Sequence, residues 1–132
     1  MILDTSFVID LMKGEKKALN KLEELKENEV SVRITSLTGY ELYLGVKNLD
    51  KPEKEKDKIE AFMDKVLGER VPYRWDHGKK SAEIQSKLKD QGEMIDLPDI
   101  LIASVAAETG EKILTRNGKH FEKVEGIEVE SY

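Results

Sequence analysis

Residues 95–107 read IDLPDILIASVAA and are apolar almost all round when drawn as a helix. This pattern predicts a helix packed in the interior, with Pro98 at its first position, where a missing N–H costs nothing. Asp99 shares one helical stripe with Ile95 and Ile102, at spacings of four and three residues. A carboxylate on such a stripe is costly unless a cation or hydrogen-bond donors meet it. Asp99 is therefore a candidate metal ligand.

The composition narrows the chemistry of such a site. The 132-residue chain has no cysteine and only two histidines, which excludes thiolate metal sites and leaves little scope for zinc. A site built from oxygen ligands favours Mg²⁺ or Mn²⁺. The length predicts one domain over residues 1–132. The formal net charge of −5 argues against a protein that coats nucleic acid, but not against an enzyme that acts on it.

The hydropathy pattern bears on location. No apolar run approaches the roughly 20 residues that a membrane helix needs. The opening residues MILD have no basic segment followed by an apolar one, so no signal peptide is expected. These features predict a cytoplasmic protein that does not enter a membrane.

Short apolar runs alternate with amphipathic segments along the chain. Strands are expected at residues 2–4, 30–35, 71–73, 112–115 and 127–130. Helices are expected through residues 7–12, 15–27, 37–46, 59–67, 82–88 and 95–107, the third of them capped by Ser36 or Thr38. Strands alternating with helices predict an α/β fold, with a parallel sheet covered on both faces.

Two more acids, Asp4 and Glu41, lie in apolar settings far from Asp99 in the sequence. In open parallel sheets, ligands bind beyond the carboxyl ends of the strands. Asp4 ends the first expected strand, and the helix with Glu41 begins just after the second. Asp99 reaches the same rim if its helix begins there. Singly, each is as readily a capping, first-turn or solvated acid; together they favour one site, with these three as catalytic metal-binding residues.

Neighbouring residues are candidates for supporting roles at this rim. Asp96 either caps the helix of Asp99 or supplies an extra ligand. Asn117 either ligates metal through its carbonyl oxygen or makes an Asx-turn. Ser6 either caps a helix or orients a carboxylate, and Thr115 ends the fourth expected strand.

The remaining polar and aromatic candidates have structural readings. Asp10 is interpreted as a surface or capping acid, and Trp75 is expected to pack in the core. His77 is interpreted as a helix-start residue. The basic group of Arg116, Lys119 and His120 either steers phosphate or is simply solvated.

Four segments resemble the motifs of PIN-domain proteins, especially VapC-type toxins. They are ILDTSFVID (residues 2–10), TGYELYLGV (38–46), LPDILIA (97–103) and LTRN (114–117), the last followed by His120 and Phe121. They occur in order across the whole chain. The resemblance implies a three-layer α/β/α sandwich around a five-stranded parallel sheet and an Mg²⁺- or Mn²⁺-dependent ribonuclease.

The resemblance also implies site residues and partners. By motif position the metal ligands are Asp4, Glu41 and Asp99, supported by Ser6. The implied partners are RNA, a VapB-type antitoxin and a second copy of the chain, with DNA reached only through the antitoxin. Family members commonly carry a fourth acid where this chain has Asn117 and His120.

Three alternatives follow from these observations. The absence of a fourth acid, where this chain has Asn117 and His120, leaves open a PIN-like binding module with weak catalysis. An RNA-processing nuclease is a closer alternative. A receiver-like Mg²⁺-binding signalling domain is more distant, because the first strand ends in one acid rather than an adjacent pair.

Overall fold

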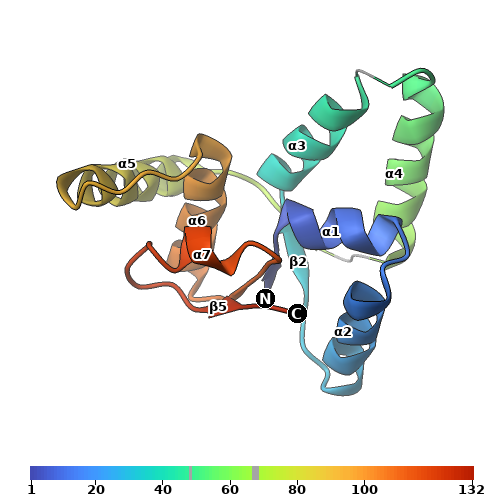
Figure 1. The fold of residues 1–132 in the computed structure, drawn as a ribbon, viewed down its shortest axis with the longest axis horizontal. Coiled ribbons are helices and arrows are strands. Elements are labelled where there is room, and N and C mark those ends of the chain that lie inside the picture. The colour runs from blue at the N-terminus through green and yellow to red at the C-terminus, as the bar shows by residue number, and fades with distance from the viewer. Residues whose placement is uncertain (48, 67–68) are drawn as a thin grey trace.

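The fold is a parallel sheet with helices packed on both of its faces (Figure 1). The computed structural model describes residues 1–47, 49–66 and 69–132. The strands are β1 (Ile2–Leu3), β2 (Arg33–Thr35), β3 (Glu69–Val71), β4 (Ile113–Leu114) and β5 (Val129–Glu130). They are all parallel and lie in the order β3-β2-β1-β4-β5. The α/β/α architecture with a five-stranded parallel sheet is thus confirmed.

Helices connect the strands in the described part of the chain. They are α1 (Thr5–Met12), α2 (Lys16–Glu27), α3 (Ser36–Val46), α4 (Pro52–Val66), α5 (Trp75–Asp90), α6 (Leu97–Thr109) and α7 (Gly118–Phe121). Every connection between strands therefore carries at least one helix, as parallel strands require.

The central strand β1 and its neighbour β4 contribute side chains to the packing of both helix layers. Leu3 and Leu114 belong to a core cluster that includes side chains of α1, α2, α3 and α4. Ile2 and Ile113 belong to a second cluster, with side chains of α5, α6 and α7. Successive side chains of a strand point to opposite faces, so each strand contributes to both clusters. Each of these four side chains is fully buried, which contributes about 1.5–3 kcal/mol per residue relative to exposure.

The expected strands were too long or displaced. β2 begins at Arg33 rather than at residue 30, and β5 has only its last two expected residues. The third strand was placed wrongly: it ends at Val71, because Pro72 has no N–H for the ladder. Its first residues, Glu69 and Arg70, are charged and exposed, as suits a strand at the edge of a sheet.

Several helix boundaries also differ from expectation. Thr35, rather than Ser36 or Thr38, caps α3, because its hydroxyl accepts a hydrogen bond from the Thr38 N–H at 3.2 Å. α6 begins at Leu97, so Pro98 is its second residue. α5 spans Trp75–Asp90 and so extends beyond both ends of the expected segment 82–88. Residue 67 of the expected helix through 59–67 lies outside the described residues.

Two aromatic residues at the start of α5 have different outcomes. Trp75 is 81% exposed, so the expectation that it packs in the core was wrong. His77 is confirmed as a helix-start residue: its ring Nδ1 accepts a hydrogen bond from the Arg74 N–H at 2.9 Å. Within the described residues, none of the helices is long and apolar enough to span a bilayer.

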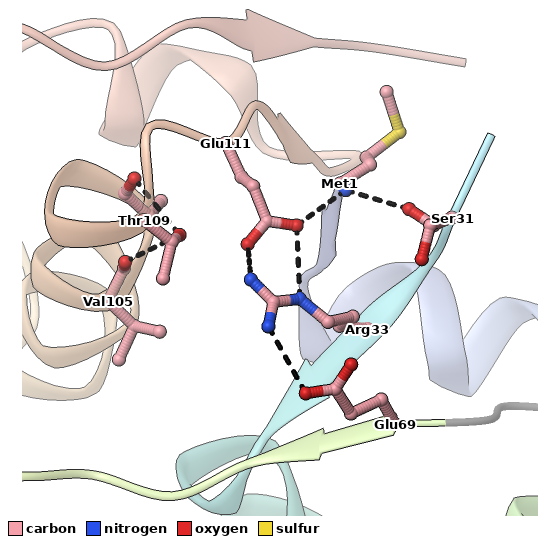
Figure 2. Close-up of polar contacts among 8 residues, drawn as sticks. Met1, Ser31, Arg33, Glu69, Val105, Thr109 and Glu111 are labelled. Carbon is pink, nitrogen blue, oxygen red and sulfur yellow. Dashed lines mark hydrogen bonds and ion pairs between the residues drawn. The ribbon is translucent and has the colours of Figure 1, made fainter.

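An ion network joins the amino ends of the strands (Figure 2). Arg33 of β2 pairs with Glu111, which precedes β4, and its Nη1 lies 3.3 Å from Glu69 Oε1 of β3. The α-ammonium group of Met1 donates to Glu111 Oε2 at 2.7 Å. Burial alone would raise the pKa of Glu111, but the hydrogen bonds from Arg33 and Met1 outweigh it and lower the pKa to about 2. This network fixes the register of four neighbouring segments.

Replacing Glu111 with Gln should lower the free energy of unfolding at pH 7 by about 1–3 kcal/mol. Because the folded pKa is depressed from 4.5 to about 2, the stabilisation is complete above pH 4.5 and disappears as the pH falls toward 2. Urea unfolding of wild type and variant across this range measures the difference. Glu128→Gln, which breaks an exposed pair with Lys112, should have little effect at any pH. A constant difference between wild type and Glu111→Gln down to pH 2 would contradict the assignment.

Candidate functional site

Asp4 lies where β1 ends and α1 begins, and its side chain is almost completely buried. Its Oδ2 atom accepts hydrogen bonds from the Ser6 hydroxyl at 2.6 Å and the Thr115 hydroxyl at 2.8 Å. The Ser6 backbone N–H also donates to Oδ2, at 3.3 Å, which makes Asp4 the N-cap of α1. Capping and a place at the rim of the sheet are therefore compatible. Three donors on one oxygen account for the burial of a charged group.

Glu41 comes from the middle of α3 and meets Asp4 at the same rim. The Thr5 hydroxyl donates to Glu41 Oε2, so the first turn of α1 orients both acids. Burial raises the pKa of Glu41; the hydrogen bond from Thr5 opposes the shift, and the negative charges of Asp4 and Asp99 add to it. Among the described residues, Glu41 thus has no cationic partner within ion-pair distance.

Asp99 lies in the first turn of α6, and its side chain is 18% exposed. Its Oδ2 atom lies 3.0 Å from Nδ1 of His120 in α7. Burial raises the pKa of Asp99 despite this contact, and the charges of Asp4 and Asp96 raise it further. Of the basic group Arg116, Lys119 and His120, it is His120 whose side chain contacts Asp99.

The three acids lie in one negatively charged region, but they do not surround a single metal-binding point. Asp4 and Asp99 each raise the pKa of Glu41 by charge repulsion, and Asp4 does the same to Asp99. Among the described residues, no three acidic or histidine side chains are drawn together closely enough to hold one ion. Carboxylates repel one another when no cation lies between them. In each acid the described side-chain hydrogen bonds end on one oxygen only, Oδ2 or Oε2.

The supporting candidates differ in how they reach the site. Ser6 and Thr115 are buried and contact Asp4 directly, as described above. Asn117 is exposed, and its backbone N–H donates to the Thr115 hydroxyl at 2.9 Å. Asp96 is also exposed: it occupies the N-cap position of α6 and makes no side-chain capping bond. It acts on Asp99 through its charge.

Asp10 was interpreted wrongly as a surface or capping acid. Its side chain is 8% exposed and pairs with Arg116 through Nη1, which lies 2.7 Å from Oδ1. The Tyr132 hydroxyl donates to Oδ2 at 2.8 Å. These partners lie 106 and 122 residues away in the chain, so no local pattern around Asp10 indicates them.

The geometry can be set beside known proteins. A family model of the PIN domain matches residues 1–127. The chain belongs to the PIN-domain family. Its relatives place it in the VapC type. Ribonuclease VapC2 of Haemophilus influenzae is 29% identical over 131 residues, which are 99% of this chain and 96% of that protein. The tRNA(fMet)-specific endonuclease VapC of Shigella flexneri is 28% identical over 131 residues, with the same coverage.

A solved structure gives the same assignment for the fold. VapBC2 from Rickettsia felis, bound to a DNA fragment from its promoter, superposes with a TM-score of 0.89 at 26% identity. The match covers 99% of this PIN-domain chain and 97% of the other. VapC-type PIN nucleases generally depend on a divalent metal ion. The carboxylate oxygens of Asp4, Glu41 and Asp99 are the ligand type that such an ion prefers, although the three side chains are not drawn together around one point. The family match removes the receiver-like alternative.

Replacing Glu41 with Gln should stabilise the metal-free protein at neutral pH. Because the pKa of Glu41 is raised in the folded state, the folded protein binds its proton more tightly, and ionisation at pH 7 costs stability. The variant should melt about 2–5 °C higher in EDTA, and excess Mn²⁺ should stabilise it less than wild type. Scanning fluorimetry with and without Mn²⁺ measures both effects. Glu23→Gln, in an exposed part of α2, is the control; a lower melting temperature for Glu41→Gln in EDTA would contradict the prediction.

Proposed function

We propose that this PIN-domain chain is an endoribonuclease, the toxin of a VapBC-type pair, and that Asp4, Glu41 and Asp99 hold Mg²⁺ or Mn²⁺. The observation that carries the proposal is the group of three acids, from the junction of β1 and α1, from α3 and from α6, which repel each other. Burial and a neighbouring charge raise the pKa of Glu41 and of Asp99, and carboxylates perturbed in this way are typical of catalytic centres. Residues 1–132 would act as one nuclease domain in the cytoplasm.

The chain's own residues prepare the three acids for this role. Ser6 and Thr115 hold Oδ2 of Asp4, Thr5 holds Oε2 of Glu41, and His120 contacts Oδ2 of Asp99. Each acid is thereby oriented through one oxygen and keeps the other for a ligand. Asp4, Glu41 and Asp99 would hold a divalent ion there, and its Lewis acidity would serve to activate water and to stabilise charge on the scissile phosphate.

An antitoxin partner fits a groove beside these acids. A hollow of about 670 Å³ between α1, α3 and α4 has Glu41 on its lining. Most of its other lining side chains are apolar: Ile9, Met12, Leu42, Val46, Leu49 and Phe62. Lys13, Glu55 and Lys58 also line it. We propose that it takes an apolar segment of a VapB-type antitoxin, whose basic side chain pairs with Glu41. DNA would be reached only through that antitoxin.

The experiment that tests the nuclease is RNA cleavage by purified protein in Mg²⁺ or Mn²⁺, with structured and single-stranded RNA. Asp99→Asn should reduce cleavage at least about 100-fold, and EDTA should abolish it, because the substitution removes a charged metal ligand. Circular dichroism checks that the variant is folded.

The matched control for this experiment is Asp76→Asn. Asp76 is also a first-turn acid, but it belongs to α5 and its side chain is 74% exposed. It should leave cleavage unchanged. If wild type binds Mn²⁺ but cuts no RNA, the binding-module alternative, which Asn117 and His120 motivate, takes precedence. If it cuts one RNA precursor at a defined site without arresting growth, the RNA-processing alternative does.

We also propose that the chain forms a homodimer. Light scattering coupled to size exclusion should then give twice the 15.1 kDa of one chain. The mass should stay the same when the sample is diluted tenfold, since obligate interfaces withstand such dilution. A mass of one chain at all concentrations would contradict this part of the proposal.

A further inference from the structure

The proposed reaction makes no use of an ion pair at this end of the sheet, in which the Asp10 side chain is 8% exposed and that of Arg116 is 55% exposed. Nη1 of Arg116 donates to both carboxylate oxygens of Asp10, at 2.7 and 2.9 Å. The Tyr132 hydroxyl donates to Asp10 Oδ2 at 2.8 Å. The three residues come from α1, from the turn after β4 and from the segment after β5. A buried acid therefore gathers three segments that are distant in sequence.

The backbone of Arg116 leads from this cluster to Asp4. The Arg116 N–H donates to the Ser6 hydroxyl at 3.1 Å, and that hydroxyl donates to Asp4 Oδ2 at 2.6 Å. Thr115, the residue before Arg116, donates its hydroxyl to the same oxygen at 2.8 Å. Two of the groups that orient Asp4 thus depend on where the turn of residues 115–117 lies.

The segment with Tyr132 is packed tightly against this turn. A Cβ on Gly118 would lie 2.8 Å from the Ser131 hydroxyl oxygen, so only glycine allows the present approach without a shift. On its other side, the Tyr132 ring packs edge-on against Phe7 of α1, with ring centroids 4.7 Å apart. The Tyr132 hydroxyl is therefore presented to Asp10 by the packing of its own ring on Phe7 and by the close approach of the preceding residue, Ser131, to Gly118.

We propose that Asp10, Arg116 and Tyr132 are positioning residues, which hold the turn of residues 115–117 against Ser6 and thereby fix the Asp4 carboxylate. Asp10 orients Arg116, Arg116 places its own N–H on Ser6, and Ser6 and Thr115 then share Oδ2 of Asp4. The consequence for metal affinity rests on the proposed function, because it requires Asp4 to be a ligand. The ordering of the turn does not require it.

The experiment compares Arg116→Met with Arg33→Met. Both remove an arginine from a pair with a buried or half-buried acid, but Arg33 lies at the amino ends of the strands (Figure 2). Amide hydrogen exchange, followed by NMR without metal, measures how well ordered the turn is at residues 116 and 117. Mn²⁺ titration calorimetry reads the consequence for the site.

Arg116→Met should accelerate exchange at residues 116 and 117 at least about tenfold and weaken Mn²⁺ binding about 10–100-fold, as losing a residue that orients a ligand does. Arg33→Met should lower overall stability, but it should not selectively change the exchange rates at residues 116 and 117 or the Mn²⁺ affinity. Tyr132→Phe keeps the ring packed on Phe7 and removes only the hydroxyl, so it should fold and show the same changes more weakly.

The proposal is overturned if Arg116→Met and Tyr132→Phe match Arg33→Met in exchange at residues 116 and 117. It is also overturned if exchange rises there while Mn²⁺ affinity stays at the wild-type value. A different result identifies failure of the proposed function: wild type and Asp99→Asn would then bind Mn²⁺ equally weakly. The exchange rates would still decide whether Asp10 and its partners order the turn.

Discussion

Burying the Asp4 carboxylate at the carboxyl end of β1 is the constraint on which this end of the molecule depends. β1 lies in the middle of the sheet between β2 and β4, so helices and neighbouring strands cover the residue that follows it. A charge there must receive donors, and the chain supplies them from Ser6 in α1 and Thr115 after β4. Hydrogen bonds to Asp4 Oδ2 consequently link the carboxyl ends of β1 and β4.

Acids at the two ends of the sheet have pKa values that are shifted in opposite directions. At the amino ends of the strands, Glu111 is met by Arg33 and Met1, and its pKa falls despite burial. At the carboxyl ends, burial and repulsion raise the pKa of both Glu41 and Asp99. A fold selected only for stability would compensate all of these charges. Acids left in mutual repulsion lower stability, and this cost is understandable where a cation from outside completes the arrangement.

The sequence predicted correctly those features that depend on residues close together in the chain. The apolar stripe around Asp99 and the alternation of strands and helices depend on neighbours within a few residues, and both the buried helix and the parallel sheet are confirmed. Asp10 was misread because its partners are set by tertiary packing, more than 100 residues away. The third strand was displaced because a charged edge strand has no apolar pattern to reveal it. That Asp4, Glu41 and Asp99 hold a metal stays a prediction.

The departure at Asn117 and His120 can be judged by its charge. A fourth carboxylate beside Asp99 would add to the repulsion that Asp4 and Asp96 already exert on it. His120 does the reverse, because its contact with Asp99 Oδ2 opposes the rise in the pKa of that acid. The site therefore keeps three acids, from the junction of β1 and α1, from α3 and from α6, while carrying less uncompensated charge than it would with a fourth acid. On this reasoning the histidine reduces the electrostatic cost of holding Asp99 in place rather than dismantling the site.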